Sequence, residues 1–203
     1  MLKLSDSLRF MKTRKFNLAE FYECSNKSEL LSAFDRLSKP IVLKISSEKY
    51  THKSDIGGIA LNIMDKKELI KAYNNLRKLS KSVVMQEQKK GAELIIGINK
   101  DSTFGKMIML GVGGVFVELI KDVSFRKAPI SKKDADEMIN ELKFKKVLEG
   151  FRGNPKVDEQ KLAELLVKIS DLAVNEKILS MDLNPVIFSG NEYYLVDARI
   201  ELE

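Results

Sequence analysis

Residues 40 to 58 constrain the fold most strongly, because an apolar strand pattern there leads into a polar, glycine-containing loop. Pro40 precedes the run Ile41–Ile45, which is apolar apart from Lys44. The length and β-branched content of this run are typical of a buried strand. A buried lysine is costly unless an anion meets its ammonium, although a lysine near a strand end can also snorkel to solvent. The run therefore predicts either an anion site at Lys44 or a lysine that reaches solvent.

The loop after this strand has the composition of a phosphate site. It holds the only histidine of the chain, His52, followed by Lys53, Ser54 and the pair Gly57-Gly58. Glycines let backbone N–H groups approach phosphate oxygens, and a lysine supplies the counter-charge. The spacing of a Walker A loop is absent. A lone histidine is often an ordinary surface residue, but phosphate chemistry is the sharper interpretation in such a loop.

Composition limits the class of protein. With 203 residues, 44% of them hydrophobic, the chain can form one large or two small domains with a real core. No apolar run approaches the roughly 18 residues of a membrane helix, and the N-terminus lacks a signal-peptide core. The single cysteine, Cys24, excludes an internal disulfide and a cysteine metal cage. These features predict a cytoplasmic protein without a membrane partner.

The net charge of +6 could suggest a nucleic-acid partner. However, the 35 basic residues are interleaved with 29 acidic ones, and the chain has no long basic block and no tryptophan. This pattern favours a lysine-rich, solvated surface over a nucleic-acid interface. A positive field of this kind would still attract an acidic ligand such as a nucleotide.

Hydrophobic periodicity and capping pairs predict an α+β chain. Asn26 with Glu29, Asp65 with Glu68, and Ser131 with Asp134 mark three helix starts, and residues 158–175 form the clearest amphipathic helix. Strands are predicted at 40–46, 58–64, 83–88, 92–98 and 107–110, with a glycine-rich corner at 111–118. Residues 1 to 24 are mixed and predict no particular element.

The C-terminal segment predicts a hairpin with a metal-binding face. If Phe188 pairs with Tyr193, the register places Asn184 opposite Asp197, with their Cβ atoms about 5 Å apart. Asp182 lies two residues before Asn184 and points the same way. Carboxylate and amide oxygens are hard ligands of the kind that magnesium takes beside substrate phosphates. The alternative is an edge strand protected by charge, and a slip of one residue would separate the pair.

Several separated motifs together carry a resemblance to a known family. The chain resembles the β subunit of archaeal ADP-forming acetyl-CoA synthetase, an ATP-grasp protein related to the succinyl-CoA synthetase β subunit, over nearly its whole length from about residue 9. The motifs, in order, are Lys44, His52 to Gly58, Gln86-Glu87, Gly91 to Glu93, Phe104-Gly105, Gly113-Gly114, Val123 to Arg126, Asp182 to Pro185 and Asp197 to Arg199.

The resemblance implies an enzyme of the acid–thiol ligase class, an ADP-forming acetate–CoA ligase. Acyl-CoA, ADP and phosphate would give the free acid, CoA and ATP, with Mg²⁺ and ATP/ADP as cofactors. The CoA-binding and phosphohistidine domains would belong to an α subunit, and α2β2 is the expected assembly. A partner interface is expected near the 52–58 loop and the 113–118 corner. An ATP-grasp carboxylate ligase that forms an acyl phosphate, or a non-catalytic regulatory subunit that keeps the fold, remains an alternative.

The resemblance also implies roles for residues that would contact the nucleotide. Lys44 would hold nucleotide phosphates, beside Lys53 and Ser54 of the loop. Gln86 and Glu87 would lie on the hinge strand near the adenine. Glu93 would lie near the ribose and phosphates.

Further implied roles concern phosphoryl transfer. His52 resembles the histidine that accepts the phosphoryl group from a phosphohistidine of the partner, and Asp182 would face that phosphohistidine. Gly113 and Gly114 would let the backbone approach the phosphoryl group. Asn184 and Asp197 would be the magnesium ligands, in agreement with the hairpin register. Ser180 stands where relatives are expected to carry an acidic residue.

The expected architecture is an α+β, ATP-grasp fold with two subdomains and nucleotide bound between them. Residues 1–21 would form an N-terminal segment, 22–86 the first subdomain and 87–203 the second.

Overall fold

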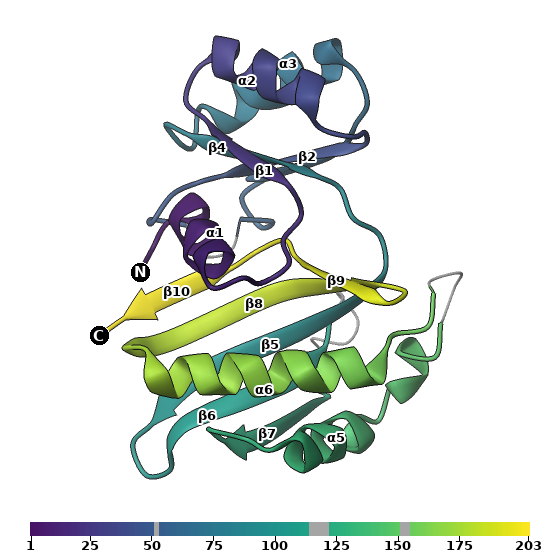
Figure 1. Ribbon diagram of the computed structural model, residues 1–203. Helices are drawn as coiled ribbons and strands as arrows, with labels where there is room; N and C mark the ends of the chain where they lie inside the picture. The colour runs from purple at the N-terminus through teal and green to yellow at the C-terminus, as the bar shows by residue number, and fades with distance from the viewer. Residues whose placement is uncertain (51–52, 114–121, 151–154) are drawn as a thin grey trace. The chain divides into compact units, whose positions relative to one another are not determined.

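The computed structural model describes residues 1–50, 53–113, 122–150 and 155–203, and it divides the chain into two compact units (Figure 1). Residues 2–89 form the N-terminal unit and residues 90–203 the C-terminal unit. Each unit combines one β-sheet with helices. The α+β class predicted from the sequence is confirmed.

The N-terminal unit is a four-stranded antiparallel sheet with the strand order β1-β4-β2-β3. Its elements are α1 (Leu4–Thr13), β1 (Phe21–Cys24), α2 (Lys27–Arg36), β2 (Ile41–Ile45), β3 (Ile59–Ile63), α3 (Lys66–Leu76) and β4 (Val83–Glu87). The predicted starts of α2 and α3 are confirmed, because the Asn26 and Asp65 side chains accept hydrogen bonds from the backbone N–H of Glu29 and Glu68.

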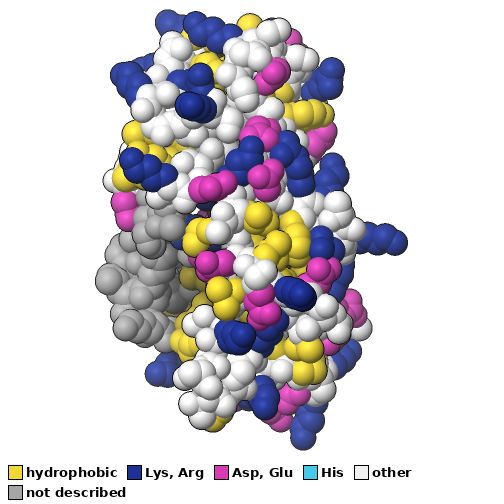
Figure 2. All heavy atoms as spheres, turned by 90° about the vertical axis from the view of Figure 1, so that its left-hand side faces the viewer, with side chains coloured by type: hydrophobic (Ala, Val, Ile, Leu, Met, Phe, Trp, Pro, Cys, Tyr) yellow, Lys and Arg dark blue, Asp and Glu magenta, His cyan; other side chains and the backbone are white. Residues whose placement is uncertain are grey.

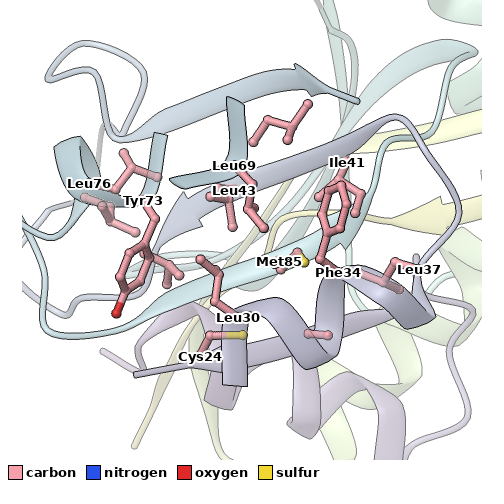
Figure 3. Close-up of a cluster of buried hydrophobic side chains, with 14 residues drawn as sticks. Cys24, Leu30, Phe34, Leu37, Ile41, Leu43, Leu69, Tyr73, Leu76 and Met85 are labelled. Atoms are coloured by element: carbon pink, nitrogen blue, oxygen red, sulfur yellow. The ribbon is translucent and has the colours of Figure 1, made fainter. Parts of the chain in front are cut away.

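A hydrophobic cluster fills the space between α2, α3 and one face of this sheet (Figure 3). Helix side chains such as Leu30, Phe34 and Leu69 meet Leu43 and Met85 of the strands there. Because side chains alternate along a strand, the remaining residues of β2 point to the opposite face. The cluster therefore decides which polar strand residues lie on that opposite face.

Helix α1 lies on the opposite face of the sheet from α2 and α3 (Figure 1). The Glu23 carboxylate of β1 accepts hydrogen bonds from Lys3 and Arg9, both at 2.8 Å. The Ser5 backbone N–H donates to the Ser46 hydroxyl at 3.2 Å. These contacts are polar, while Leu8 of the same helix is fully buried.

The C-terminal unit has a second antiparallel sheet with the order β10-β8-β5-β6-β7, and β9 also pairs with β8. Its elements are β5 (Ala92–Asp101), β6 (Gly105–Val112), β7 (Val123–Lys127), α5 (Lys132–Glu141), the 3-10 turn η1 (Lys145–Val147), α6 (Glu159–Asn175), β8 (Ile178–Ser189), β9 (Glu192–Leu195) and β10 (Arg199–Leu202). Helices α5 and α6 lie on the same face of this sheet (Figure 1).

The predicted helices and strands are present, and the structure adds elements that the sequence did not indicate. Residues 1–24 contain α1 and β1, and two further strands, β7 and β10, complete the second sheet. The predicted capping box at Ser131 and Asp134 is confirmed. The unpredicted strands have only four or five residues, which is too short for a distinct hydrophobic period.

Candidate functional site

Lys44 and Gln86 lie on the same face of the N-terminal sheet. Leu43 and Met85 belong to the cluster under α2 and α3, so their neighbours point away from it. Val42 pairs with Gln86, which places Gln86 diagonally across from Lys44 on adjacent strands. Lys44 is only 5% exposed and Gln86 is completely buried. The structure therefore brings together the predicted phosphate-binding lysine and one of the two predicted base-contacting residues.

On this face, the side-chain amide of Gln86 is the strongest candidate for binding a ligand. Neither its Oε1 nor its Nε2 makes a hydrogen bond within the part of the chain that the structure describes. A buried polar group without a partner costs about 1–3 kcal/mol, so native proteins usually satisfy it with protein, water or ligand. An amide offers one acceptor and two donors, which match the edge of a nucleobase.

The Glu87 side chain points to the other face of β4. Its Cα pairs with that of Ile41, a residue of the hydrophobic cluster. The carboxylate accepts hydrogen bonds from Lys89 Nζ at 2.6 Å and from the Ser38 backbone N–H at 3.2 Å. The Lys89 ammonium, more than any other group, lowers the pKa of Glu87. The structure thus separates the Glu87 side chain from those of Lys44 and Gln86. Only the backbone of Glu87 lies next to Gln86, on β4.

The loop predicted to bind phosphate begins outside the described residues, because His52 is not among them. Lys53, which is 4% exposed, and the exposed Ser54 start a tight turn that ends at Gly58. The Gly58 N–H donates to the Lys53 carbonyl oxygen at 2.7 Å, and a Cβ on Gly58 would lie 2.8 Å from that oxygen. Gly57 has a positive φ of 68°. Both glycines are therefore required by the turn itself.

Glu93 and Gly113 meet where β5 begins and β6 has just ended. The Gly113 N–H donates to the Glu93 carbonyl oxygen at 2.7 Å, and a Cβ on Gly113 would lie 3.0 Å from it. This N–H is therefore engaged within the protein. Glu93 itself is exposed, and the predicted Gly114 lies outside the described residues.

The hairpin register predicted from the sequence is confirmed, since Phe188 pairs with Tyr193. The β8–β9 ladder ends with Val186 opposite Leu195, and the β8–β10 ladder starts with Asp182 opposite Arg199. Three residues on each strand separate the two ladders. Asn184 and Asp197 are the central residues of these two facing stretches.

Asn184 and Asp197 offer a donor set that fits magnesium. Both present hard oxygen ligands, and Asp197 is 7% exposed while Asn184 is exposed. Within the described ranges, no group of three or more His, Cys, Asp or Glu side chains could hold a metal ion. An incomplete set of this kind suits an ion that is also bound by substrate phosphates.

Two further polar pairs continue along β8 and β10. The Arg199 guanidinium lies 4.0 Å from the Asp182 carboxylate. At the next position of the same face, the Ser180 hydroxyl donates to Glu201 Oε2 at 3.3 Å. The pairings of Arg199 and Glu201 were not predicted from the sequence, although the predicted hairpin register gives both when it is extended by two and four residues.

Cys24 does not provide a nucleophile. Burial, together with the nearby Glu29 and Glu23 carboxylates, raises the pKa of the Cys24 thiol to about 12. The thiol therefore stays protonated at neutral pH.

The molecular surface agrees with the prediction from charge. Figure 2 shows Lys and Arg side chains spread over the visible face and interspersed with Asp and Glu. In the part of the chain that the structure describes, no helix is both long and apolar enough to cross a bilayer.

Comparison with known proteins identifies the family to which this fold belongs. Residues 1–202 match the ATP-grasp domain family. The sequence is 36% identical over 194 residues to the Pyrococcus furiosus acetate–CoA ligase [ADP-forming] I subunit beta, covering 90% of this chain and 84% of that protein. The chain therefore belongs to the ATP-grasp family and, within it, to the β subunits of ADP-forming acetate–CoA ligases.

Longer relatives contain this region as one part. The Archaeoglobus fulgidus acetate–CoA ligase [ADP-forming] II is 38% identical over 180 residues, which cover 87% of this chain. The match spans 27% of the length of that relative, so this chain corresponds to less than a third of it.

Solved structures show the same fold. Candidatus Korarchaeum cryptofilum acetyl-coenzyme A synthetase 1, in complex with coenzyme A, Ca-AMPCP and HgCl+, matches with a TM-score of 0.92 and 37% identity, covering 100% of this chain and 93% of that one. The same enzyme with coenzyme A and Mg-AMPPCP, its phosphohistidine segment pointing towards the nucleotide binding site, matches with a TM-score of 0.83 and 39% identity, covering 98% and 92%.

Proposed function

We propose that this chain is the nucleotide-binding subunit of an ADP-forming acyl-CoA synthetase and transfers a phosphoryl group from phosphohistidine to ADP. The observation that supports the proposal most is the pairing of Phe188 with Tyr193 in the C-terminal hairpin. Continued along both strands, this register would bring Asn184 opposite Asp197, with Asp182 two residues away. Membership of the β-subunit family and the Mg-AMPPCP bound by the Korarchaeum relative support it. The overall reaction would convert acyl-CoA, ADP and phosphate to the acid, CoA and ATP.

Residues of both units would contact the nucleotide. From the N-terminal unit, Lys44 would neutralise phosphate charge with help from Lys53 and Ser54, and the unsatisfied Gln86 amide would bind the base. Glu87 would contribute through its backbone, because Lys89 and Ser38 engage its carboxylate.

From the C-terminal unit, Glu93 would lie near the ribose. Gly113 and Gly114 would form the corner that faces the phosphoryl group, with Gly113 keeping that corner close to the Glu93 backbone. Asn184 and Asp197 would hold Mg²⁺, which when bound would offset the negative charge on the phosphates.

His52 would relay the phosphoryl group. A neutral imidazole nitrogen attacks phosphorus, the P–N bond of the partner phosphohistidine breaks, and a P–N bond to His52 forms. In the second step a β-phosphate oxygen of ADP takes the phosphoryl group, which leaves His52 neutral and yields ATP. Asp182 would face the phosphohistidine of the partner during the first step.

The reaction would require another polypeptide. An α subunit would carry the CoA-binding and phosphohistidine domains, in an α2β2 assembly, and it would dock near the 52–58 loop and the 113–118 corner. The name of the Pyrococcus relative, a subunit beta, supports a partner of this kind. A cytoplasmic location stays a prediction.

The relay can be tested by following label. The chain would be mixed with an α subunit carrying a radiolabelled phosphohistidine, with and without Mg-ADP. We expect label on the wild-type chain that chases into ATP when Mg-ADP is added. His52→Ala should bind Mg-ADP normally but take up no label and form no ATP.

Label that reaches ATP equally well through His52→Ala would contradict the relay. An enzyme that makes an acyl phosphate without any phosphohistidine would instead transfer phosphate from ATP to the free acid. The assembled complex should also lose ATP formation when it carries Asp197→Ala. Full activity of that variant would show that metal-assisted transfer does not depend on Asp197.

A further inference from the structure

We propose that Arg199 is a positioning residue that holds the Asp182 carboxylate towards the phosphohistidine of the partner. The inference deepens the proposed function and rests on it. It begins from the contact between the two side chains on adjacent strands of the C-terminal sheet. Arg199 is the first residue of β10, and its Cα pairs directly with that of Asp182 on β8.

The contact is an ion pair on a surface that a partner can reach. Arg199 and Asp182 lie 4.0 Å apart, and their side chains are 27% and 40% exposed. Surface ion pairs contribute little to stability, at most about 1 kcal/mol, so stability does not explain why this pair is present. A partly exposed pair next to a proposed transfer site is better suited to controlling the position of one carboxylate.

Asp182 also has a neighbour on its other side, on β5. On that side, the Cα of Asp182 pairs with Gly97 of β5, which has no side chain. The Met109 methyl group lies 3.3 Å from the position that a Gly97 Cβ would occupy. Asp182 therefore sits between a cationic neighbour on β10 and an apolar, side-chain-poor surface on β5.

This arrangement suits recognition of a phosphorylated imidazole. The carboxylate can accept a hydrogen bond from the ring nitrogen that does not carry the phosphoryl group, while the ring lies over the Gly97–Met109 surface. Arg199 would hold the carboxylate in a fixed direction before the partner arrives. The pair is longer than a hydrogen bond, as is common for such contacts before substrate binds.

The same strands provide a matched control. Glu201 lies two residues after Arg199 on the same face of β10, and it accepts a hydrogen bond from Ser180, which lies two residues before Asp182. This second pair joins the same two strands in the same register. Its substitution therefore reports any general damage to the β8–β10 ladder.

The test is a double-mutant cycle on the complex of this chain with the phosphohistidine-labelled α subunit. Single-turnover ATP formation would be measured for wild type, Arg199→Met, Asp182→Asn and the double variant, over a range of partner concentrations. We expect Arg199→Met to slow transfer about tenfold, as for residues that orient a reacting group, with unchanged binding of Mg-ADP. Arg199→Lys should restore much of the rate.

The decisive result is coupling between the two positions. If Arg199 acts through Asp182, Arg199→Met should have no further effect once Asp182→Asn is present. Equal, additive losses in both backgrounds, or an equal loss in Glu201→Gln, would overturn the inference while leaving the relay intact. Failure of the wild-type complex to make ATP would overturn the proposed function and this inference together.

Discussion

At the residue scale, Gln86 combines complete burial with an amide that lacks hydrogen bonds in the described structure. Replacing Gln86 should therefore change the stability of the chain and its affinity for nucleotide in opposite directions. Gln86→Leu removes the unsatisfied group and should stabilise the nucleotide-free chain by about 1 kcal/mol. The same substitution should weaken Mg-ADP binding about tenfold, because the base loses a hydrogen-bonding partner.

Thermal unfolding with and without Mg-ADP checks both effects in one experiment. The midpoint without nucleotide should rise in Gln86→Leu, while the increase caused by Mg-ADP should shrink. A matched change at Val42, the neighbour that pairs with Gln86 on the same face, serves as the control. Val42→Ala should lower the midpoint through lost packing and leave the nucleotide-induced increase in place. An unchanged affinity in Gln86→Leu would remove Gln86 from the base site.

The residue types favoured a phosphate site as a hypothesis, and the structure adds what individual residues do in the fold. The paired Gly57 and Gly58 pointed to a phosphate-binding turn, and the structure shows that Gly58 is required because the Lys53 carbonyl oxygen lies too close for a Cβ. Likewise, the N–H of Gly113 is engaged by Glu93. Such close approaches depend on which strands become neighbours, and composition does not encode that.

At the element scale, α1 is attached to the N-terminal sheet through Glu23. Burial alone would raise the pKa of Glu23, but hydrogen bonds from Lys3 and Arg9 outweigh it and lower the pKa to about 2. A carboxylate with a lowered pKa binds fewer protons in the folded state than in the unfolded state, where its pKa is about 4.3. Its contribution is therefore complete above about pH 5 and is lost as the pH falls towards 2.

Glu23→Gln should accordingly lower the free energy of unfolding by about 1 kcal/mol at pH 7, a value reduced for partial exposure. Denaturant unfolding at several pH values provides the measurement. The difference between wild type and variant should shrink between pH 4 and pH 2 as the wild-type carboxylate becomes protonated. A difference that stays constant over this range would show that the ion pairs do not anchor α1.

Elements with local signals were predictable, and elements held by distant contacts were not. Asn26, Asp65 and Ser131 marked helix starts correctly, since a cap needs only residues close in sequence. Helix α1 buries Leu4, Leu8 and Met11 at helical spacing, but Ser5 and Ser7 are buried beside them. Ser5 contacts Ser46, which is 41 residues away, and no local pattern indicates that contact. Strand β10 follows a three-residue interruption, and the register rather than the local pattern reveals it.

At the scale of the whole molecule, the candidate site residues fall into two groups, one in each compact unit. Lys44 and Gln86 belong to residues 2–89, whereas Asp182, Asn184 and Asp197 belong to residues 90–203. Both groups could be proposed from the sequence because each follows from the pattern of its own strands. To predict which side chains share a face of a sheet, one needs the register of the assembled strands. Glu87, which points away from Lys44, is an example.

If one nucleotide contacts both groups of residues, binding of Mg-ADP should affect both units. Amide hydrogen exchange of the full chain should then slow on Mg-ADP addition in β2 and β4 of the N-terminal unit and also in β8 of the C-terminal unit. Lys44→Met should reduce this protection in both units, because the lost phosphate contact weakens binding as a whole. Lys66→Met, which removes an exposed lysine paired with Asp35 in the same unit, should leave the protection unchanged. Protection confined to one unit at saturating Mg-ADP would show that the nucleotide is bound by that unit alone, and the residues of the other unit would then need a different role.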